Sequence, residues 1–114
     1  MPLIWPLNAT LTLIRQRRLE QQNFEWSANH DHMNIWNRIS FQILASDNFF
    51  ATGRQCQIKW QALKSGYENI MNIERNRTRG RTIRPPNRYD RFFHQEMTDE
   101  FWIPSGNYLI QIYS

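Results

Sequence analysis

The clearest structural signal in this chain of 114 residues lies in residues 52–70, TGRQCQIKWQALKSGYENI. Thr52 and Gln55 have the spacing of a capping box, in which each side chain accepts a hydrogen bond from the other residue's backbone N–H. Apolar residues then recur at steps of four, three, four and three, at Cys56, Trp60, Leu63, Tyr67 and Ile70. This spacing predicts a helix with one buried stripe. We expect the helix to continue to about Arg75, despite a cost of about 1 kcal/mol for Gly66 relative to Ala.

A first helix is predicted from about Pro6 to Gln22. Pro6 suits the first helical turn, where its missing N–H costs nothing. The apolar positions of this segment are Leu7, Leu11, Leu13, Ile14 and Leu19. Its arginines Arg15, Arg17 and Arg18 spread around the helix, and we expect them to be solvated. Phe24 and Trp26 end the segment with bulky side chains.

A second helix is predicted from about Ala28 to Leu44, with Ser27 or Asn29 as its N-cap. Its apolar stripe consists of Ile35, Trp36, Ile39 and Ile43. A loop over residues 45–51 separates it from the third helix. That loop is longer than the three or four residues of a minimal helix-turn-helix turn.

The C-terminal part is predicted to hold a fourth helix after a linker. Residues 76–86, NRTRGRTIRPP, are basic and rich in residues that break helices. The fourth helix spans about 87–100, and its apolar side carries Tyr89, Phe92, Phe93 and Met97. The organisation predicted is a three-helix bundle over 1–75, a linker over 76–86, a fourth helix within 87–103 that packs on or beside the bundle, and a tail over 104–114. Residues 108–113 of that tail have a strand-like composition.

Positive charge is concentrated in one part of the chain. Residues 54–91 contain ten of the fourteen Lys and Arg residues but only three of the ten Asp and Glu residues. Residues 1–53 hold four of each sign, and residues from 92 onward hold three acidic residues and no basic one. Such a distribution indicates either a surface for a polyanion or a solvated basic loop.

The order and spacing of three tryptophans resemble the Myb/SANT-like family. Trp5 precedes the first helix, Trp36 lies in the second, and Trp60 follows Cys56 in the third within a run typical of Myb domains. The run from Trp5 to Ile14 and the aromatic fourth helix resemble the trihelix variety of this family. The resemblance covers roughly residues 5–100. It implies an all-α helix-turn-helix bundle of three helices with an additional C-terminal helix, and a third helix that enters the DNA major groove.

Helix geometry identifies the face of the third helix that would meet DNA. If the stripe from Cys56 to Ile70 faces the core, a turn of about 100° per residue places a second set on the opposite face. The expected base-facing residues are Arg54, Ile58, Gln61, Ala62 and Ser65, with Asn69 further along. Arg54 suits guanine, and Gln61 suits adenine. Ile58 would either contact a thymine methyl group or belong to a surface that no longer recognises DNA bases.

Further residues are expected to contact phosphates. These are Gln55, Lys59 and Lys64 on the flanks of the third helix, and Arg77, Arg79, Arg81 and Arg84 of the linker. For the linker, minor-groove insertion and a free solvated loop are the alternatives.

Other classes of function find no support in the sequence. We expect no enzyme, because no phosphate-binding loop, nucleophile elbow or matched carboxylate pair is present. We expect no cofactor and no metal. The side chains of His30 and His32 diverge at the start of a helix, and His94 is distant in the sequence. The single cysteine, Cys56, lies on the core stripe. No run of apolar residues is long enough to span a membrane, and no signal peptide is recognised. Asn8-Ala9-Thr10 and Asn76-Arg77-Thr78 match the glycosylation triplet by chance.

The expected partner is therefore double-stranded DNA, and the expected location is the nucleus. A small-molecule substrate is not expected. The alternative is a SANT-type protein-interaction module of a chromatin complex, for which the resemblance implies a more acidic third helix than one carrying Arg54, Lys59 and Lys64. A protein partner is also open for the fourth helix or the tail, and a family member that retains the fold but binds only weakly is a third interpretation.

Overall fold

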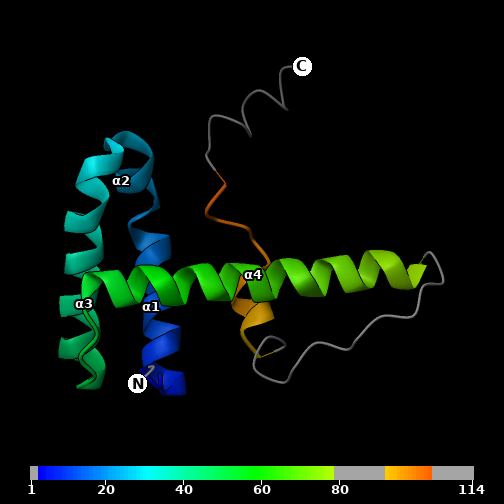
Figure 1. The fold of residues 1–114 in the computed structure, drawn as a ribbon, viewed down its shortest axis with the longest axis horizontal. Helices are drawn as coiled ribbons and strands as arrows, with labels where there is room; N and C mark the ends of the chain where they lie inside the picture. The colour runs from blue at the N-terminus through cyan, green and yellow to red at the C-terminus, as the bar shows by residue number, and fades with distance from the viewer. Residues whose placement is uncertain (1–2, 79–91, 104–114) are drawn as a thin grey trace.

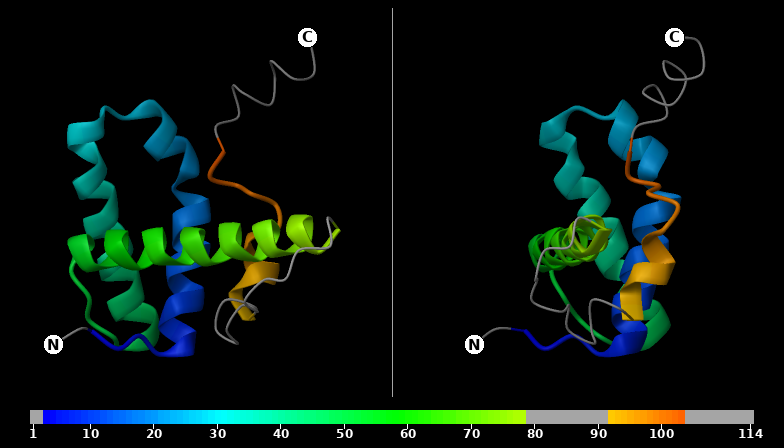
Figure 2. Two further views of the ribbon diagram at one scale, coloured as in Figure 1. Left: turned by 45° about the vertical axis from the view of Figure 1, so that its right-hand side comes forward. Right: turned by 90° about the vertical axis from the view of Figure 1, so that its right-hand side faces the viewer.

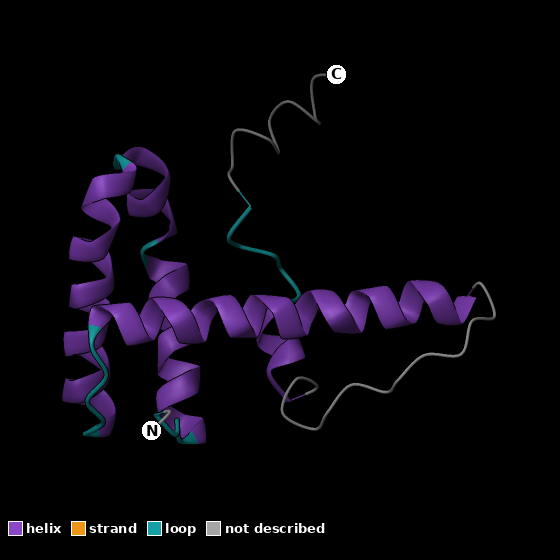
Figure 3. Ribbon diagram, viewed as in Figure 1, coloured by secondary structure: helices purple, strands orange, loops and turns teal. Residues whose placement is uncertain are grey.

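The computed structural model describes residues 3–78 and 92–103, with side chains for 3–74 and 92–103. Within these ranges the chain forms helices joined by short loops and no strand (Figure 3). The predicted all-α fold class is confirmed. The tail over 104–114, with its strand-like residues 108–113, lies outside the described residues.

The segment predicted as one first helix forms two, α1 (Leu7–Leu19) and α2 (Gln21–Trp26). The carbonyl of Pro6 accepts a hydrogen bond from the backbone N–H of Thr10, so α1 begins where the sequence predicts. The predicted end at Gln22 is wrong because the backbone leaves helical geometry at Glu20, with φ −90° and ψ 2°. The break turns α2 so that the Phe24 ring reaches Trp36, 5.0 Å away between ring centroids.

The buried face of α1 differs from the predicted one. Arg17 is buried, although we expected it to be solvated, and Leu19 is 73% exposed, although we expected it in the core. The two residues are roughly 200° apart around a helix, so both cannot face inward. Arg17 takes the inner position because its guanidinium stacks on Phe24, with Cζ 4.0 Å from the ring centroid.

α3 (His32–Asp47) begins and ends later than predicted. A 3-10 turn, η1 (Asn29–Asp31), precedes it, and neither Ser27 nor Asn29 caps it with a side-chain hydrogen bond. At its other end, Asn48 adopts left-handed backbone angles and donates its N–H to the carbonyl of Leu44. Asn tolerates this conformation better than most residues, so it ends the helix. The connection to the next helix is consequently shorter than the predicted loop over 45–51.

α4 (Gly53–Thr78) contains the quoted stretch of sequence. The capping box is formed: Thr52 N–H donates to Gln55 Oε1 at 2.8 Å, and Gln55 N–H donates to Thr52 Oγ1 at 3.1 Å. The whole stripe from Cys56 to Ile70 is buried. α4 also includes residues 76–78, which the sequence predicts as part of the linker.

The helices are arranged as an antiparallel pair crossed by a third. α1 and α3 run side by side, and α4 lies across both of them, nearly perpendicular (Figure 1). The C-terminal half of α4 extends past the pair. The described C-terminal segment returns to the bundle beside α1, as the turned views show (Figure 2).

The core is built largely from aromatic rings. Trp36 and Trp60 are buried, and Trp5 is half-buried with its ring centroid 5.0 Å from that of Phe49. Trp60 packs against Phe101 and Trp102 at 5.4 and 5.7 Å between centroids. The C-terminal segment therefore completes the cover over the central tryptophan.

The predicted fourth helix is only partly present in the described residues. Residues 92–94 form a helical turn, and η2 (Gln95–Met97) follows as a 3-10 turn, so the helix ends before the predicted Glu100. Phe93 and Met97 are buried, Phe92 is half-exposed, and Tyr89 lies outside the described residues. Side chains of the bundle fix this end of the chain: Tyr67 Oη donates to Glu100 Oε2, and Arg18 Nη2 donates to the Glu96 carbonyl, each at 2.6 Å.

Replacing Trp60 tests this description of the core. Trp60→Ala is expected to lower the free energy of unfolding by about 3–5 kcal/mol, because it removes a buried indole and leaves a cavity. The melting temperature should fall by roughly 10 °C or more. Trp26→Ala is a matched control, since Trp26 is 82% exposed and its loss should change the melting temperature little. Equal effects of the two substitutions would contradict the central position of Trp60.

Candidate nucleic-acid interface

The face of α4 opposite the core stripe lies in solvent. Five predicted base-facing residues and Asn69 are all exposed: Arg54, Ile58, Gln61, Ala62, Ser65 and Asn69. They recur at helical spacing over four turns, so they form one continuous strip along α4. Ile58, in the middle of the N-terminal half of this strip, is 56% exposed and is its large apolar member.

Arg54 stands in the first turn of α4 at one end of the strip. Its Nη1 donates to Oε1 of Gln57 at 3.1 Å, which orients the guanidinium along the helix. The other guanidinium donors project from an exposed side chain. Arg54 thus presents a planar set of hydrogen-bond donors at the N-terminal end of the exposed face.

The flanks of α4 carry the predicted phosphate-contacting residues in different environments. Gln55 is exposed, but its side-chain oxygen is already engaged in the capping box. Lys59 and Lys64 are half-buried. By helix geometry they lie on opposite flanks of the exposed strip, so one cation borders each side of it.

The structure does not describe the predicted linker contacts. The backbone of Arg77 belongs to the last turn of α4, but its side chain is outside the described set. Arg79, Arg81 and Arg84 lie wholly outside the described residues. The basic segment nevertheless follows directly from the C-terminal end of α4 in the sequence.

Comparison of the sequence with known protein families identifies the family of this helical domain. The sequence model of the Myb/SANT-like DNA-binding domain family matches residues 3–97, which include α1 to α4 and the buried Phe93 and Met97. The chain belongs to this family. DNA binding is accordingly its general function. Comparisons with curated proteins and with solved structures give no match.

The cysteine and the histidines of this Myb/SANT-like domain make contacts within the fold. Burial raises the pKa of Cys56 to about 12, so at neutral pH its side chain is a thiol packed in the core. His30 is paired with Asp31 at 3.5 Å, His32 Nε2 donates to the Phe24 carbonyl, and His94 stacks on Tyr67. No cluster of three or more His, Cys, Asp or Glu residues that could hold a metal occurs within residues 3–78 and 92–103. No helix in those ranges is long and apolar enough to cross a membrane.

A close approach of α3 and α4 positions the start of the exposed face, and the sequence did not reveal it. Gly53 is buried, and a Cβ placed on it would overlap the Asn37 side-chain oxygen and lie 3.1 Å from the Asn37 backbone nitrogen. The side chain can rotate away, but the backbone nitrogen belongs to α3. Gly53 therefore lets the two helices touch one residue before Arg54.

Gly53→Ala is expected to destabilise the domain by about 1–3 kcal/mol, because the added methyl group forces α3 and α4 apart. Chemical denaturation measures the effect. Ser65→Ala, a small change at an exposed position of the same helix, should leave stability within about 0.5 kcal/mol of the original protein. A Gly53→Ala protein as stable as the Ser65→Ala protein would show that the helices can separate without cost.

Proposed function

We propose that this Myb/SANT-like domain binds double-stranded DNA with α4 in the major groove and reads bases with the exposed strip of that helix. The observation that supports this proposal is the position of the strip, since the buried stripe on the opposite face of α4 directs polar and basic side chains outward. A major groove about 12 Å wide accepts one α-helix. The proposed role is that of a transcription-factor-like or transposon-related protein of the trihelix variety that acts in the nucleus.

Three residues of the strip have a chemically distinct proposed role: Arg54, Gln61 and Ile58. Arg54 is the proposed guanine reader, because its fork matches the paired acceptors N7 and O6. Gln61 is the proposed adenine reader, Ile58 would contact a thymine methyl, and Ala62 and Ser65 complete the face. Lys59 and Lys64 would hold the two flanks of α4 to phosphates, together with Gln55.

The exposed apolar Ile58 also supports a second candidate function. An exposed apolar side chain is common in protein interfaces, whose buried centres are depleted in charge. A SANT-type protein-interaction module would use the same helix face. The experiments below distinguish the two functions, because only base reading makes affinity depend on DNA sequence.

Arg54→Ala is expected to weaken binding to the preferred site by about 1–3 kcal/mol and to relax preference at one base position. The preferred site is first obtained by selection from random oligonucleotides at about 150 mM salt, a concentration that weakens non-specific binding. Titrations of both proteins against that site and its single-base variants then measure the effect.

Lys64→Ala is the matched comparison for Arg54→Ala. A lost phosphate contact weakens binding to all sequences alike, so its effect should be uniform over the same set of sites. If Arg54→Ala also weakens binding to every site of the set equally, base reading by Arg54 is refuted. If neither substitution changes DNA affinity, the protein-interaction function is favoured.

The linker arginines are proposed to contact phosphates. Replacing Arg77, Arg79, Arg81 and Arg84 by Gln should flatten the dependence of log affinity on log salt concentration by up to about 3.6, at about 0.9 for each lost contact. Replacing one exposed arginine outside this region, Arg15→Gln on α1, provides the control. A slope equal to that of the control would place the linker arginines in solvent.

A further inference from the structure

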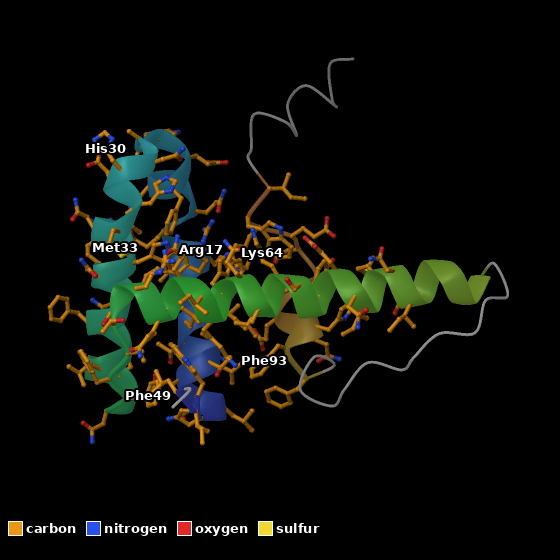
Figure 4. The ribbon with its side chains drawn as sticks, in the orientation of Figure 1. Arg17, His30, Met33, Phe49, Lys64 and Phe93 are labelled. Carbon is orange, nitrogen blue, oxygen red and sulfur yellow. The ribbon has the colours of Figure 1, made fainter. Side chains whose placement is uncertain are left out.

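A cavity of about 240 Å³ opens beside the exposed strip of α4. Gln57, Gln61 and Lys64 of α4 form one wall, and Arg17, Phe24 and Trp36 of α1, α2 and α3 contribute to the rest. Gln61 belongs to the proposed base-facing strip, so the cavity borders that strip directly. In Figure 4 the labelled Arg17 and Lys64 lie on the same side of α4.

Arg17 is an unusual cation, because this residue is only 8% exposed. Its guanidinium lies between the rings of Phe24 and Trp60, with Cζ 4.0 and 5.4 Å from the two centroids. Nη1 donates to Gln21 Oε1 at 2.6 Å, whereas Nε is buried without a hydrogen-bond partner among the described residues. Gln21 in turn donates to the Trp102 carbonyl, so Arg17 is held by neighbours that are themselves fixed.

The cavity has a net positive charge. Burial lowers the pKa of Arg17 to about 10, and the nearby Glu25 carboxylate acts in the opposite direction, so Arg17 stays protonated at neutral pH. Arg17 and Lys64 are thus two cations against the one carboxylate of Glu25. His32 also lines the cavity, with its Nε2 hydrogen-bonded to the Phe24 carbonyl. A buried guanidinium with unused donor capacity gains stability from a bound anion.

The position of the cavity indicates which anion reaches it. An α-helix with side chains is about 10–12 Å across, and the major groove is about 12 Å wide. When such a helix lies in the groove, its two flanks face the two phosphate backbones. Lys64 and Gln57 occupy one flank of α4, and the cavity lies on that flank.

We propose that the mouth of this cavity binds one phosphate of the DNA backbone, held jointly by Arg17 and Lys64. This inference rests on the proposed function, because it requires α4 in the major groove. Arg17 supplies planar, directional donors, and Lys64 supplies a compact charge from the opposite wall. A phosphate bound between α1 and α4 also fixes the orientation of the bundle on the duplex, since it joins a supporting helix to the recognition helix.

The experiment compares the salt dependence of binding in four versions of the 114-residue chain: the original, Arg17→Gln, Lys64→Gln and the double variant. Removing both cations should lower the slope of log affinity against log salt by about 0.9, the value for one phosphate, and not by about 1.8. The slope for Arg15→Gln, an exposed arginine of the same helix, should equal that of the original protein. Lys59→Gln on the opposite flank of α4 should reduce the slope independently of both substitutions.

The outcomes separate this inference from the proposed function. A slope lowered by about 1.8 in the double variant would assign Arg17 and Lys64 to two different phosphates and overturn the shared site. A slope in the double variant equal to that of Lys64→Gln alone would overturn the role of Arg17 while leaving DNA binding by α4 in place. Absence of any DNA binding by the original protein would refute the proposed function itself, and this inference with it.

A second measurement avoids dependence on the folding of Arg17→Gln. Single phosphates of the selected duplex are replaced by neutral methylphosphonates. The affinity of each modified duplex is measured for the original protein and for Lys64→Gln, in which the changed residue is half-buried. One replacement beside the α4 site should weaken the original protein several-fold and Lys64→Gln less, because only the contact with Arg17 remains to be lost. If every methylphosphonate affects the two proteins equally, Lys64 contacts no phosphate and the inference is wrong.

Discussion

The indole of Trp60 is 1% exposed on a helix whose opposite face lies in solvent, and α4 cannot cover such a large ring by itself. Cover comes from Phe101 and Trp102 of the C-terminal segment and from the guanidinium of Arg17 on α1. Burial of this ring therefore brings together parts of the chain that are far apart in sequence. Because a helix is rigid about its axis, an inward Trp60 also requires an outward Arg54 and Ser65. The stability of the core and the orientation of the candidate interface share this one cause.

The sequence alone predicts the structural features that depend on residues close together in the chain. The capping box of Thr52 and Gln55 and the buried stripe that follows depend on residues three and four apart, so they could be predicted. The exposed positions of α4 follow from the same geometry. The break at Glu20 could not be predicted, because it depends on the distant contact between Phe24 and Trp36. The left-handed Asn48 was missed for a related reason: Asn is compatible with that conformation but does not require it.

Two residues show how tertiary contacts override expectations from residue type. Arg17 was expected in solvent because Arg15, Arg17 and Arg18 spread around the first helix, yet the aromatic rings of α2 and α4 supply a place for its planar cation. Gly53 lies inside the capping sequence of α4, and its missing side chain allows α3 and α4 to meet. Neither role leaves a signal in spacing or composition, because each is defined by a neighbour distant in the chain.

The burial of Cys56 has a practical consequence for locating DNA on this domain. It is the single cysteine of the chain, and its thiol, packed in the core with a pKa of about 12, offers almost no thiolate to alkylating reagents at neutral pH. A cysteine introduced on the solvent side of α4 would therefore be the one readily labelled thiol of the folded protein. A cleavage reagent or spin label attached there would report its distance to individual nucleotides, with the native cysteine left unchanged.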